Sequence, residues 1–417
     1  MSLFPEKGMA EEEIRTRLFT IRNSIQPFTS RALRKYSGVI HPSATEAIEI
    51  LRPLNLNHLG TPTRLKTPSS QGIAAIEREV ILMLGELMGS TEVDGYITQG
   101  GTEANIMGLW IGRNMLRVNR NLERKICLIK TSLTHYSIYK AIDLLDIPRV
   151  VDVPLNENYG MSSSELKTTL EKLANEGFRE FLVVLTLGYN TTGTVDPIDE
   201  IDVVLHESEE KLGITTYTHL DAVIGGMIYP FATEKPLNFR YPSVKSIALD
   251  MNKNGFVSPT AGVFLARKGL QQWIERPAPY IKGRKIDDTL SGSRPGVQVA
   301  ACWSAIQALG KEGFKKIVAE KIELKEYLFA LLEKNKAALS PLIISHPSIN
   351  VAAIHLGSFT EGKVPNFIEK KYSLTPLRFA IDEKNEKYIY TVVFMPHLET
   401  SVLEEFVRDL LQNRPVY

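Results

Sequence analysis

The stretch at residues 181–187, Phe-Leu-Val-Val-Leu-Thr-Leu, is a continuous apolar run that contains a single threonine. A short apolar run predicts a β-strand, whereas helices appear as longer stretches with a period near 3.6 residues. A strand that is apolar on both faces must be covered on both faces, as in parallel sheets. The stretch therefore predicts a buried strand in a mostly parallel sheet.

The segments around this run alternate between strand-like and helix-like patterns. Further short apolar runs predict strands at 126–130, 215–220, 246–249 and 262–266. Helical periodicity predicts helices at 73–88, 136–145 and 198–211, and another directly after Gly100-Gly101. This alternation predicts an α/β fold with helices on both faces of the sheet. Ligands of such sheets bind at the carboxyl ends of the strands.

The length of 417 residues predicts more than one domain, because a domain holds on the order of 100–200 residues. We expect an N-terminal arm at 1–60, a large domain at 61–310 and a smaller α+β domain at 311–417. The arm is helix-prone at 10–21 and then rich in proline, so we expect it to pack on the main body or on a partner subunit. The small domain contains short apolar runs at 350–355 and 388–394, and its last helix starts at Ser401.

The overall charge is nearly balanced, with 49 basic and 48 acidic residues. This balance provides no field that would attract nucleic acid or an anionic membrane. The cysteines, Cys127 and Cys302, have neither CxxC nor metal-ligand spacing, so we expect buried free thiols and no metal. No segment approaches the ~20 apolar residues of a membrane span, and we expect a cytoplasmic protein.

A first polar motif, Gly100-Gly101-Thr102, follows a predicted strand and opens a helix. Free backbone amides and the positive end of the helix dipole meet there, which suits a phosphate group. The alternative is an ordinary turn in which Thr102 caps the helix. A second motif places His135 before a helix, where it can stack on an aromatic cofactor ring or can simply be a capping or core residue.

Asp221 ends the apolar strand at 215–220, where a carboxylate is costly to bury without a partner. A protonated pyridine nitrogen is a fitting partner, and the small Ala222 beside it leaves room for a flat ring. The alternative is a helix N-cap. Lys253 follows the strand at 246–249, where burial would favour the neutral amine that forms a Schiff base; the alternative is a loop lysine that reaches water.

Together these motifs supply a phosphate cradle, a ring-stacking histidine, a carboxylate for a ring nitrogen and a Schiff-base lysine. Pyridoxal phosphate (PLP) requires these four interactions from a protein. The sequence resembles the group II PLP-dependent decarboxylases of fold type I, and is most similar to the archaeal-type tyrosine/aspartate decarboxylases. The segments that carry the resemblance are 6–8, 100–105, 192–196, 219–226, 292–296 and 393–397.

The resemblance implies a PLP-dependent transferase-like large domain, a homodimer with active sites near the interface, and decarboxylation of an L-amino acid such as tyrosine, aspartate or glutamate. It implies that Lys253 carries PLP, His135 stacks on the pyridine ring, Asp221 pairs with the ring nitrogen, Thr186 approaches the ring hydroxyl, and Gly100, Gly101 and Thr102 hold phosphate.

Three departures from the family pattern bear on the pocket. Asn252 stands where the family usually has a histidine, and it can still donate a hydrogen bond to phosphate. Gly188-Tyr189-Asn190 replaces a Gly-Thr-Thr run, and Ala222-Val223 replaces Ala-Ala. We still expect PLP binding despite these departures, and they leave the identity of the substrate open.

Outside these motifs, Tyr280 is a candidate proton donor, Arg294 a candidate for binding a carboxylate or phosphate, and His41 a candidate for the substrate pocket. Two other functions remain. One is carbon–carbon cleavage, as in sphingosine-phosphate-type lyases, which share a segment like 292–296. The other is a catalytically silent PLP-fold binding protein, suggested by Asn252 and the altered run at 188–190.

Overall fold

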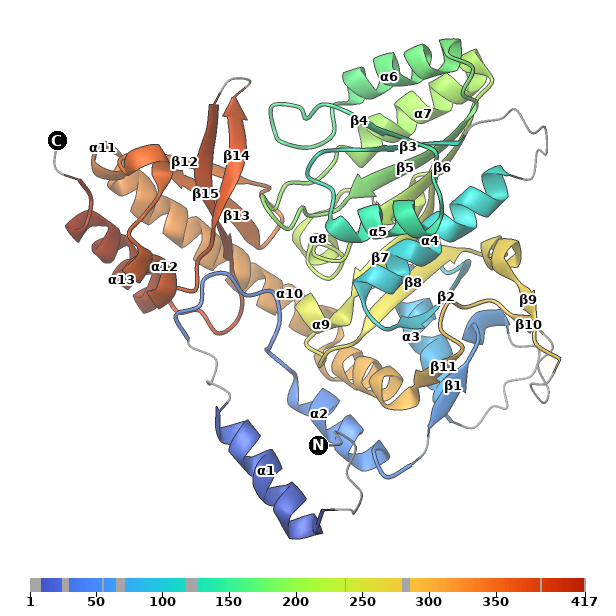
Figure 1. Cartoon of the computed structure of the whole chain (residues 1–417), viewed down its shortest axis with the longest axis horizontal. Helices are drawn as coiled ribbons and strands as arrows, with labels where there is room; N and C mark the ends of the chain where they lie inside the picture. Colours follow the sequence, from blue (N-terminus) through green and yellow to red (C-terminus); the bar gives the residue numbers. More distant parts are fainter. Residues whose placement is uncertain are drawn as a thin grey trace, which may run out of the picture.

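The computed structural model describes residues 9–24, 30–54, 56–64, 72–117, 126–236, 238–279, 286–382 and 385–415. A seven-stranded sheet lies at its centre, with the strand order β2-β8-β7-β6-β5-β3-β4 (Figure 1). Its strands are β2 (Val93–Thr98), β3 (Ile126–Lys130), β4 (Arg149–Asp152), β5 (Glu180–Thr186), β6 (Thr215–Asp221), β7 (Val244–Asp250) and β8 (Gly262–Arg267).

The neighbouring strands from β4 to β7 pair in parallel, whereas β8 is antiparallel to both β7 and β2. The mostly parallel α/β sheet predicted from the sequence is therefore confirmed.

Both faces of the sheet are covered by helices, which explains the continuous apolar run in β5. Leu182 and Val184 pack with one core cluster, whereas Val183 and Leu185 pack with the other. The first cluster includes α4 (Gly101–Leu116) and α5 (Tyr136–Leu144). The second includes α3 (Ile73–Leu87), α6 (Ser163–Asn175), α7 (Ile198–Leu212) and the start of α10 (Gly296–Lys334). Alternate side chains of one strand thus enter two separate cores.

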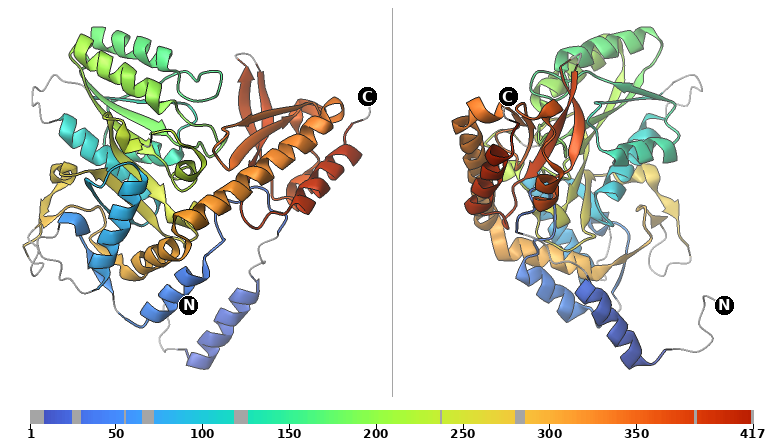
Figure 2. Two further views of the ribbon diagram at one scale, coloured as in Figure 1. Left: turned by 180° about the vertical axis from the view of Figure 1, so that it is seen from behind. Right: turned by 60° about the vertical axis from the view of Figure 1, so that its left-hand side comes forward.

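A second sheet of four antiparallel strands lies toward the C-terminus, in the order β12-β13-β15-β14. Its strands are β12 (Pro341–Ser345), β13 (Val351–Leu356), β14 (Pro376–Asp382) and β15 (Asn385–Val393). The helices of this part are α11 (Lys336–Leu339), α12 (Asn366–Lys371) and α13 (Thr400–Gln412). The long α10 runs from the central sheet to this second sheet and kinks at Gly310, whose φ is 57° (Figure 2).

The N-terminal segment connects the two sheets. Helix α1 (Glu11–Ser24) has no buried residue, whereas α2 (Pro42–Leu51) packs against α10. Between them, Leu33 is fully buried in the C-terminal core. The amide of Val393 donates to the carbonyl of Leu33 at 2.7 Å. This attachment holds residues 30–41 across the carboxyl edge of the central sheet, near the polar motifs.

The remaining short elements connect these parts. They are β1 (Asn57–Leu59), β9 (Arg276–Pro277), β10 (Ile286–Asp287), β11 (Ser293–Pro295), α8 (Tyr229–Ala232), α9 (Met251–Asn254), and the 3-10 helices at 62–64, 238–240, 270–274 and 360–362. Cys127 and Cys302 are buried and unpaired, as expected. Within the described ranges, no helix combines the length and apolarity that crossing a membrane requires.

The contact between α4 and β6 gives a first prediction. A Cβ added to Gly108 would lie 2.1 Å from Nδ1 of His219. We expect Gly108→Ala to lower the free energy of unfolding by about 1–3 kcal/mol, because overpacking forces the helix away from the sheet. Urea unfolding followed by circular dichroism measures the change.

Gly292→Ala is the matched control, because an added Cβ there meets nothing within 4 Å. It should shift the stability by less than about 0.5 kcal/mol. Equal unfolding midpoints for Gly108→Ala and the wild type would contradict the close approach of α4 to β6.

Candidate active site

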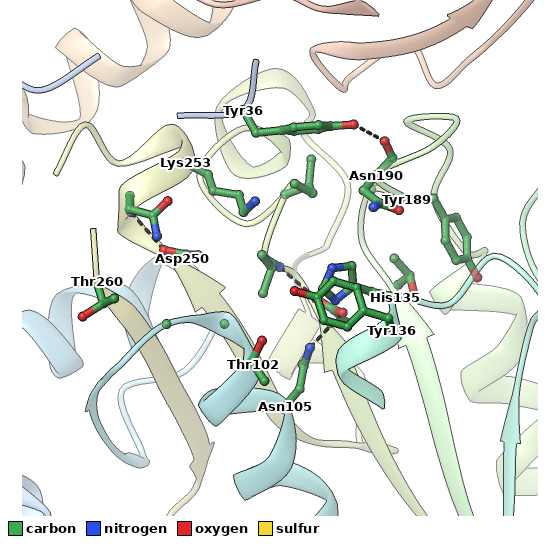
Figure 3. Close-up of a pocket in the computed structure, with 18 of the residues that line it drawn as sticks. Tyr36, Thr102, Asn105, His135, Tyr136, Tyr189, Asn190, Asp250, Lys253 and Thr260 are labelled. Atoms are coloured by element: carbon green, nitrogen blue, oxygen red, sulfur yellow. Dashed lines mark hydrogen bonds between the residues drawn. The ribbon is translucent and has the colours of Figure 1, made fainter. Parts of the chain in front are cut away.

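A cavity of about 290 Å³ lies at the carboxyl edge of the central sheet (Figure 3). Its walls come from the loops that follow β2, β3, β5, β6 and β7, and from the N-terminal segment. Eight of the residues predicted for the site line it together: Gly100, Gly101, Thr102, His135, Thr186, Asp221, Asn252 and Lys253. Residues far apart in the sequence thus meet because parallel strands present their carboxyl ends at one edge.

One end of the cavity is formed by the start of α4. Gly100 has φ 124°, a conformation that favours glycine, and a Cβ placed there would meet nothing within 4 Å. The amides of the first helical turn have no partner within the helix. The amide of Gly101 donates to the buried carboxylate of Asp250, and the rest of the turn opens onto the cavity, where the helix N-terminus suits an anion. The capping role suggested for Thr102 is wrong, since Gly100 occupies the N-cap and Thr102 lies inside the first turn.

Glu103 holds the preceding turn in place. Its carboxylate accepts hydrogen bonds from the amide of Gln99 at 2.8 Å and from the hydroxyl of Tyr96 at 2.8 Å. Gln99 also lines the cavity. The turn before α4 is therefore held in place by the side chain of Glu103.

Asp221 lies at the end of β6 with only 5% of its surface exposed. Its Oδ2 accepts a hydrogen bond from Nδ2 of Asn105 at 3.0 Å, and its Oδ1 accepts one from the amide of Val223 at 3.2 Å. Burial raises the pKa of Asp221, whereas the neighbouring His135, these hydrogen bonds and the amine of Lys253 oppose the rise. Asp221 caps no helix, because residues 223–228 form turns.

His135 combines two of the roles considered for it. It is the N-cap of α5, where its Nδ1 accepts a hydrogen bond from the amide of Ser137 at 3.3 Å, and it also lines the cavity. Burial lowers the pKa of His135; the nearby carboxylate of Asp221 opposes this shift, and the charges of Lys253 and Lys140 add to it. The neutral imidazole is therefore the favoured form.

Lys253 belongs to α9, directly after β7, and is half-buried. Its side chain extends into the cavity below the ring of Tyr36, with Nζ 5.1 Å from the ring centroid (Figure 3). Among the described residues, none accepts a hydrogen bond from this Nζ. Asp250 caps α9, and its Oδ1 accepts a hydrogen bond from the amide of Asn252 at 3.0 Å. The amine is thus presented to the cavity by a short, capped helix.

Among the lining residues that sequence reasoning missed, three interact with the groups described above. Asp250 lies in the stretch already singled out around Lys253, and Asn105 in the motif that follows Gly100, so both had a local signal. Tyr36 had none, because it comes from the N-terminal segment. Its hydroxyl donates a hydrogen bond to the carbonyl of Asn190, and burial raises the pKa of Tyr36 to about 12.

The altered run at 188–190 forms part of the wall of the cavity. Tyr189 is fully buried, and its hydroxyl lies 2.9 Å from Oδ1 of Asp196 and 2.8 Å from the hydroxyl of Thr131. Its ring supports the loop, whereas the neighbouring Asn190 faces Tyr36 (Figure 3). The residues that depart from the family pattern therefore form part of the cavity wall and do not fill the cavity.

Other residues predicted for the site lie elsewhere. Ala222 is buried behind Asp221 and is not part of the lining. Arg294 is buried in β11, where its Nη2 donates to both carboxylate oxygens of Glu77, at 3.0 and 3.1 Å. His41 caps α2 by accepting a hydrogen bond from the amide of Ser43 at 3.2 Å. These partners keep Arg294 and His41 out of the cavity. Tyr280 lies outside the described residues.

The residues of the cavity fit PLP. The hydroxyl of Thr186 is buried, interacts with the hydroxyl of Tyr189 and makes no hydrogen bond of normal geometry with the described residues, so it can turn to a polar group of a ligand. Asp221 offers a buried carboxylate, Lys253 an amine, and the start of α4 its amides. A flat ring that carries a protonated nitrogen, a hydroxyl, an aldehyde and a phosphate matches this set.

Comparisons with known proteins agree with this match. Residues 63–350 match the family described as the pyridoxal-dependent decarboxylase conserved domain. The chain is 31% identical to an L-aspartate decarboxylase of Thermococcus kodakarensis, over 98% of both chains. It is 32% identical to a tryptophan decarboxylase of Clostridium sporogenes, over 85% of this chain and 82% of that protein.

Among solved structures, the fold is similar to that of L-methionine decarboxylase from Streptomyces sp. 590. The TM-score is 0.81 at 18% sequence identity, over 98% of this chain and 96% of that chain. This likeness concerns the fold, and it confirms the predicted PLP-dependent transferase-like class.

The buried His219 behind the cavity gives a prediction for pH dependence. Burial lowers the pKa of His219 to about 3. Between this value and the ordinary histidine pKa of about 6.5, the unfolded chain binds a proton that the folded chain does not. The stability that His219 contributes is therefore complete above the higher value. It is lost as the pH falls, at about 1.4 kcal/mol per pH unit.

We expect the free energy of unfolding of His219→Asn to depend less steeply on pH in this range than that of the wild type. His206→Asn is the control, since the His206 side chain is 74% exposed and should leave the slope unchanged. Chemical denaturation at a series of pH values measures the slopes. The same slope for all three proteins would contradict a neutral, buried His219.

Proposed function

The chain belongs to the pyridoxal-dependent decarboxylase family, and on this premise we propose that it decarboxylates an L-amino acid with Lys253 as the residue that holds the cofactor. The family makes the protein a PLP-dependent carboxy-lyase, as the sequence predicted. The assignment of individual residues and of the substrate is our proposal.

The observation that carries the proposal is the convergence of three groups in one cavity. These are the amine of Lys253, the buried carboxylate of Asp221 and the buried hydroxyl of Thr186. PLP, when bound, supplies an electron sink for the pair that remains on the substrate when carbon dioxide leaves. The chain's own residues have to hold and orient the cofactor and to protonate the substrate carbon.

Each residue has a defined task in this proposal. Lys253 binds the cofactor covalently, and Asp221 keeps a proton on the ring nitrogen by pairing with it. His135 covers one face of the ring, and Thr186 donates to or accepts from the ring hydroxyl. The amides at the start of α4, with Thr102, bind the phosphate. Tyr280 is the proposed proton donor to the substrate carbon.

The lining of the cavity favours a substrate with an uncharged or aromatic side chain. Lys253 is the only lysine or arginine among the described lining residues, and it is assigned to the cofactor. Tyr36 and Tyr136 offer aromatic surfaces instead. Because a side-chain carboxylate without a cation is costly to desolvate, tyrosine fits this part of the site better than aspartate or glutamate.

We further propose that the active form is a homodimer. Helix α1 stands away from the body of the chain and exposes four large apolar side chains: Ile14, Leu18, Phe19 and Ile21 (Figure 1). A second copy would cover them. Light scattering should give the mass of two chains, and a particle of one chain would contradict this part of the proposal.

Removal of the amine at position 253 tests the proposed function. We expect Lys253→Ala to lose the visible absorption band that forms when PLP is added to the wild type. Borohydride reduction should attach the cofactor to Lys253 of the wild type, as identified by peptide mass spectrometry. The variant should also lose release of carbon dioxide, by at least about a thousandfold, since the covalent catalyst is missing.

Lys245→Ala is the control, because Lys245 lies on the same strand, β7, and donates to the carbonyl of Pro242 away from the cavity. It should retain the absorption band and the activity. Carbon dioxide release is assayed with aromatic, acidic, basic and thioether amino acids. A label on another lysine, or no release from any of these substrates, would overturn the proposed function.

A further inference from the structure

Asn105 lies between Asp221 and His135, the two residues assigned to the cofactor ring. It lies in the second turn of α4, is 1% exposed, and lines the cavity. Its Nδ2 donates hydrogen bonds to Oδ2 of Asp221 at 3.0 Å and to the hydroxyl of Ser137 at 2.9 Å. Its Oδ1 lies 2.9 Å from Nε2 of His219. Both donor positions of the amide nitrogen are therefore used, and the amide oxygen has a buried partner.

The direction of these hydrogen bonds follows from the chemistry of the partners. An ionised Asp221 can only accept, so the amide nitrogen of Asn105 faces it and the amide oxygen faces His219. Nε2 of His219 must then carry a proton. His219 is neutral because burial lowers its pKa to about 3, so its Nδ1 accepts from the hydroxyl of Ser246 at 2.8 Å. The hydrogen bond from His219 thereby fixes the orientation of the Asn105 amide.

The second hydrogen bond of the Asn105 amide nitrogen connects it to His135 through Ser137. Nδ1 of His135 accepts the amide of Ser137 at 3.3 Å, so this nitrogen carries no proton. The hydroxyl of Ser137, which accepts from Asn105, therefore donates to Nδ1 at 2.8 Å. A neutral His135 therefore carries its proton on Nε2, the nitrogen that is not used in the cap.

We propose that Asn105 is a positioning residue that couples Asp221 to His135. Its amide nitrogen holds Asp221 as an oriented, ionised carboxylate, and through Ser137 it holds the proton of His135 on Nε2. The inference rests on the proposed function, since it takes Asp221 and His135 as the partners of the cofactor ring. Asn105 itself acts through these two residues.

The charges around Asp221 define what a change at Asn105 should do. The groups that face Asp221 are His135 at the start of α5, Lys253 in α9, the amide of Val223 and Asn105. His135 is also faced by Lys140. The hydrogen bond from Asn105 lowers the pKa of Asp221, against the effect of burial. Without it the carboxylate takes up a proton at a higher pH.

PLP binding reports this protonation directly. Asp221 pairs with a protonated ring nitrogen only while it is ionised, so affinity for PLP falls as the pH falls through the pKa of Asp221. This fall in affinity at low pH is the acid limb of PLP binding. Loss of the Asn105 hydrogen bond should move the acid limb to higher pH by about one unit. At neutral pH the affinity should fall about tenfold to hundredfold, as expected for a hydrogen bond to a charged group.

The experiment compares Asn105→Ala and Asn105→Asp with the wild type. The apoproteins are titrated with PLP at a series of pH values, and dissociation constants are taken from tryptophan fluorescence. Asn105→Asp keeps the shape of the side chain, so it serves if the space left by Asn105→Ala prevents folding. It also places a carboxylate against Asp221, which should move the acid limb in the same direction.

Two further variants show whether an effect belongs to Asn105. Asn238→Ala removes another buried asparagine, far from the cavity lining, and should leave the acid limb in place. Ser137→Ala interrupts only the branch to His135; it should lower kcat and leave the acid limb of PLP binding in place. Thermal unfolding of the apoproteins checks that each variant is folded.

Unchanged affinity and an unchanged acid limb in both Asn105 variants would overturn the inference. An equal shift in Ser137→Ala would also overturn it, because the effect would then come from His135. The proposed function fails separately, if the wild type neither binds PLP at Lys253 nor releases carbon dioxide.

Discussion

A carboxylate buried at the end of a strand is the constraint on which the site depends. Desolvating Asp221 costs several kcal/mol unless donors compensate for the lost water. The fold supplies an amide from Val223, an amide nitrogen from Asn105 and the nearby imidazole of His135. Lys253 also faces Asp221, but its amine is assigned to the cofactor, and none of the other three groups is a full counter-charge. The remaining demand for a cation is what a protonated ring nitrogen in the cavity would satisfy.

The architecture of the chain brings the other groups to this carboxylate. Parallel strands end at one edge, so the last residues of β5 and β6, Thr186 and Asp221, lie around one cavity with Lys253 of α9, which follows β7. Helix α4 starts at the same edge and adds its N-terminal turn and Asn105. The N-terminal segment, tied to the C-terminal core through Leu33, closes the cavity with Tyr36. The central sheet and the N-terminal segment thus form the site, and the C-terminal core anchors that segment.

The sequence predicted the central part of this arrangement because the signals there are local. Apolar runs mark the strands, and the residues that follow them reach the cavity by the rule for parallel sheets. Contacts between distant segments left no such signal. Tyr36 enters from the N-terminal segment, and Arg294 is taken out of the cavity by a pairing with Glu77 across 217 positions. The role of Asn105 became visible only with the hydrogen bonds of its amide.

The pairing of Asp221 with the ring nitrogen is the central claim, and a cofactor analogue tests it most directly. The analogue carries carbon in place of that nitrogen and is otherwise PLP. The account predicts that the wild type binds PLP about tenfold to hundredfold more tightly than the analogue, and that this ratio falls to about one in Asp221→Ala. The same ratio in both proteins would contradict the account.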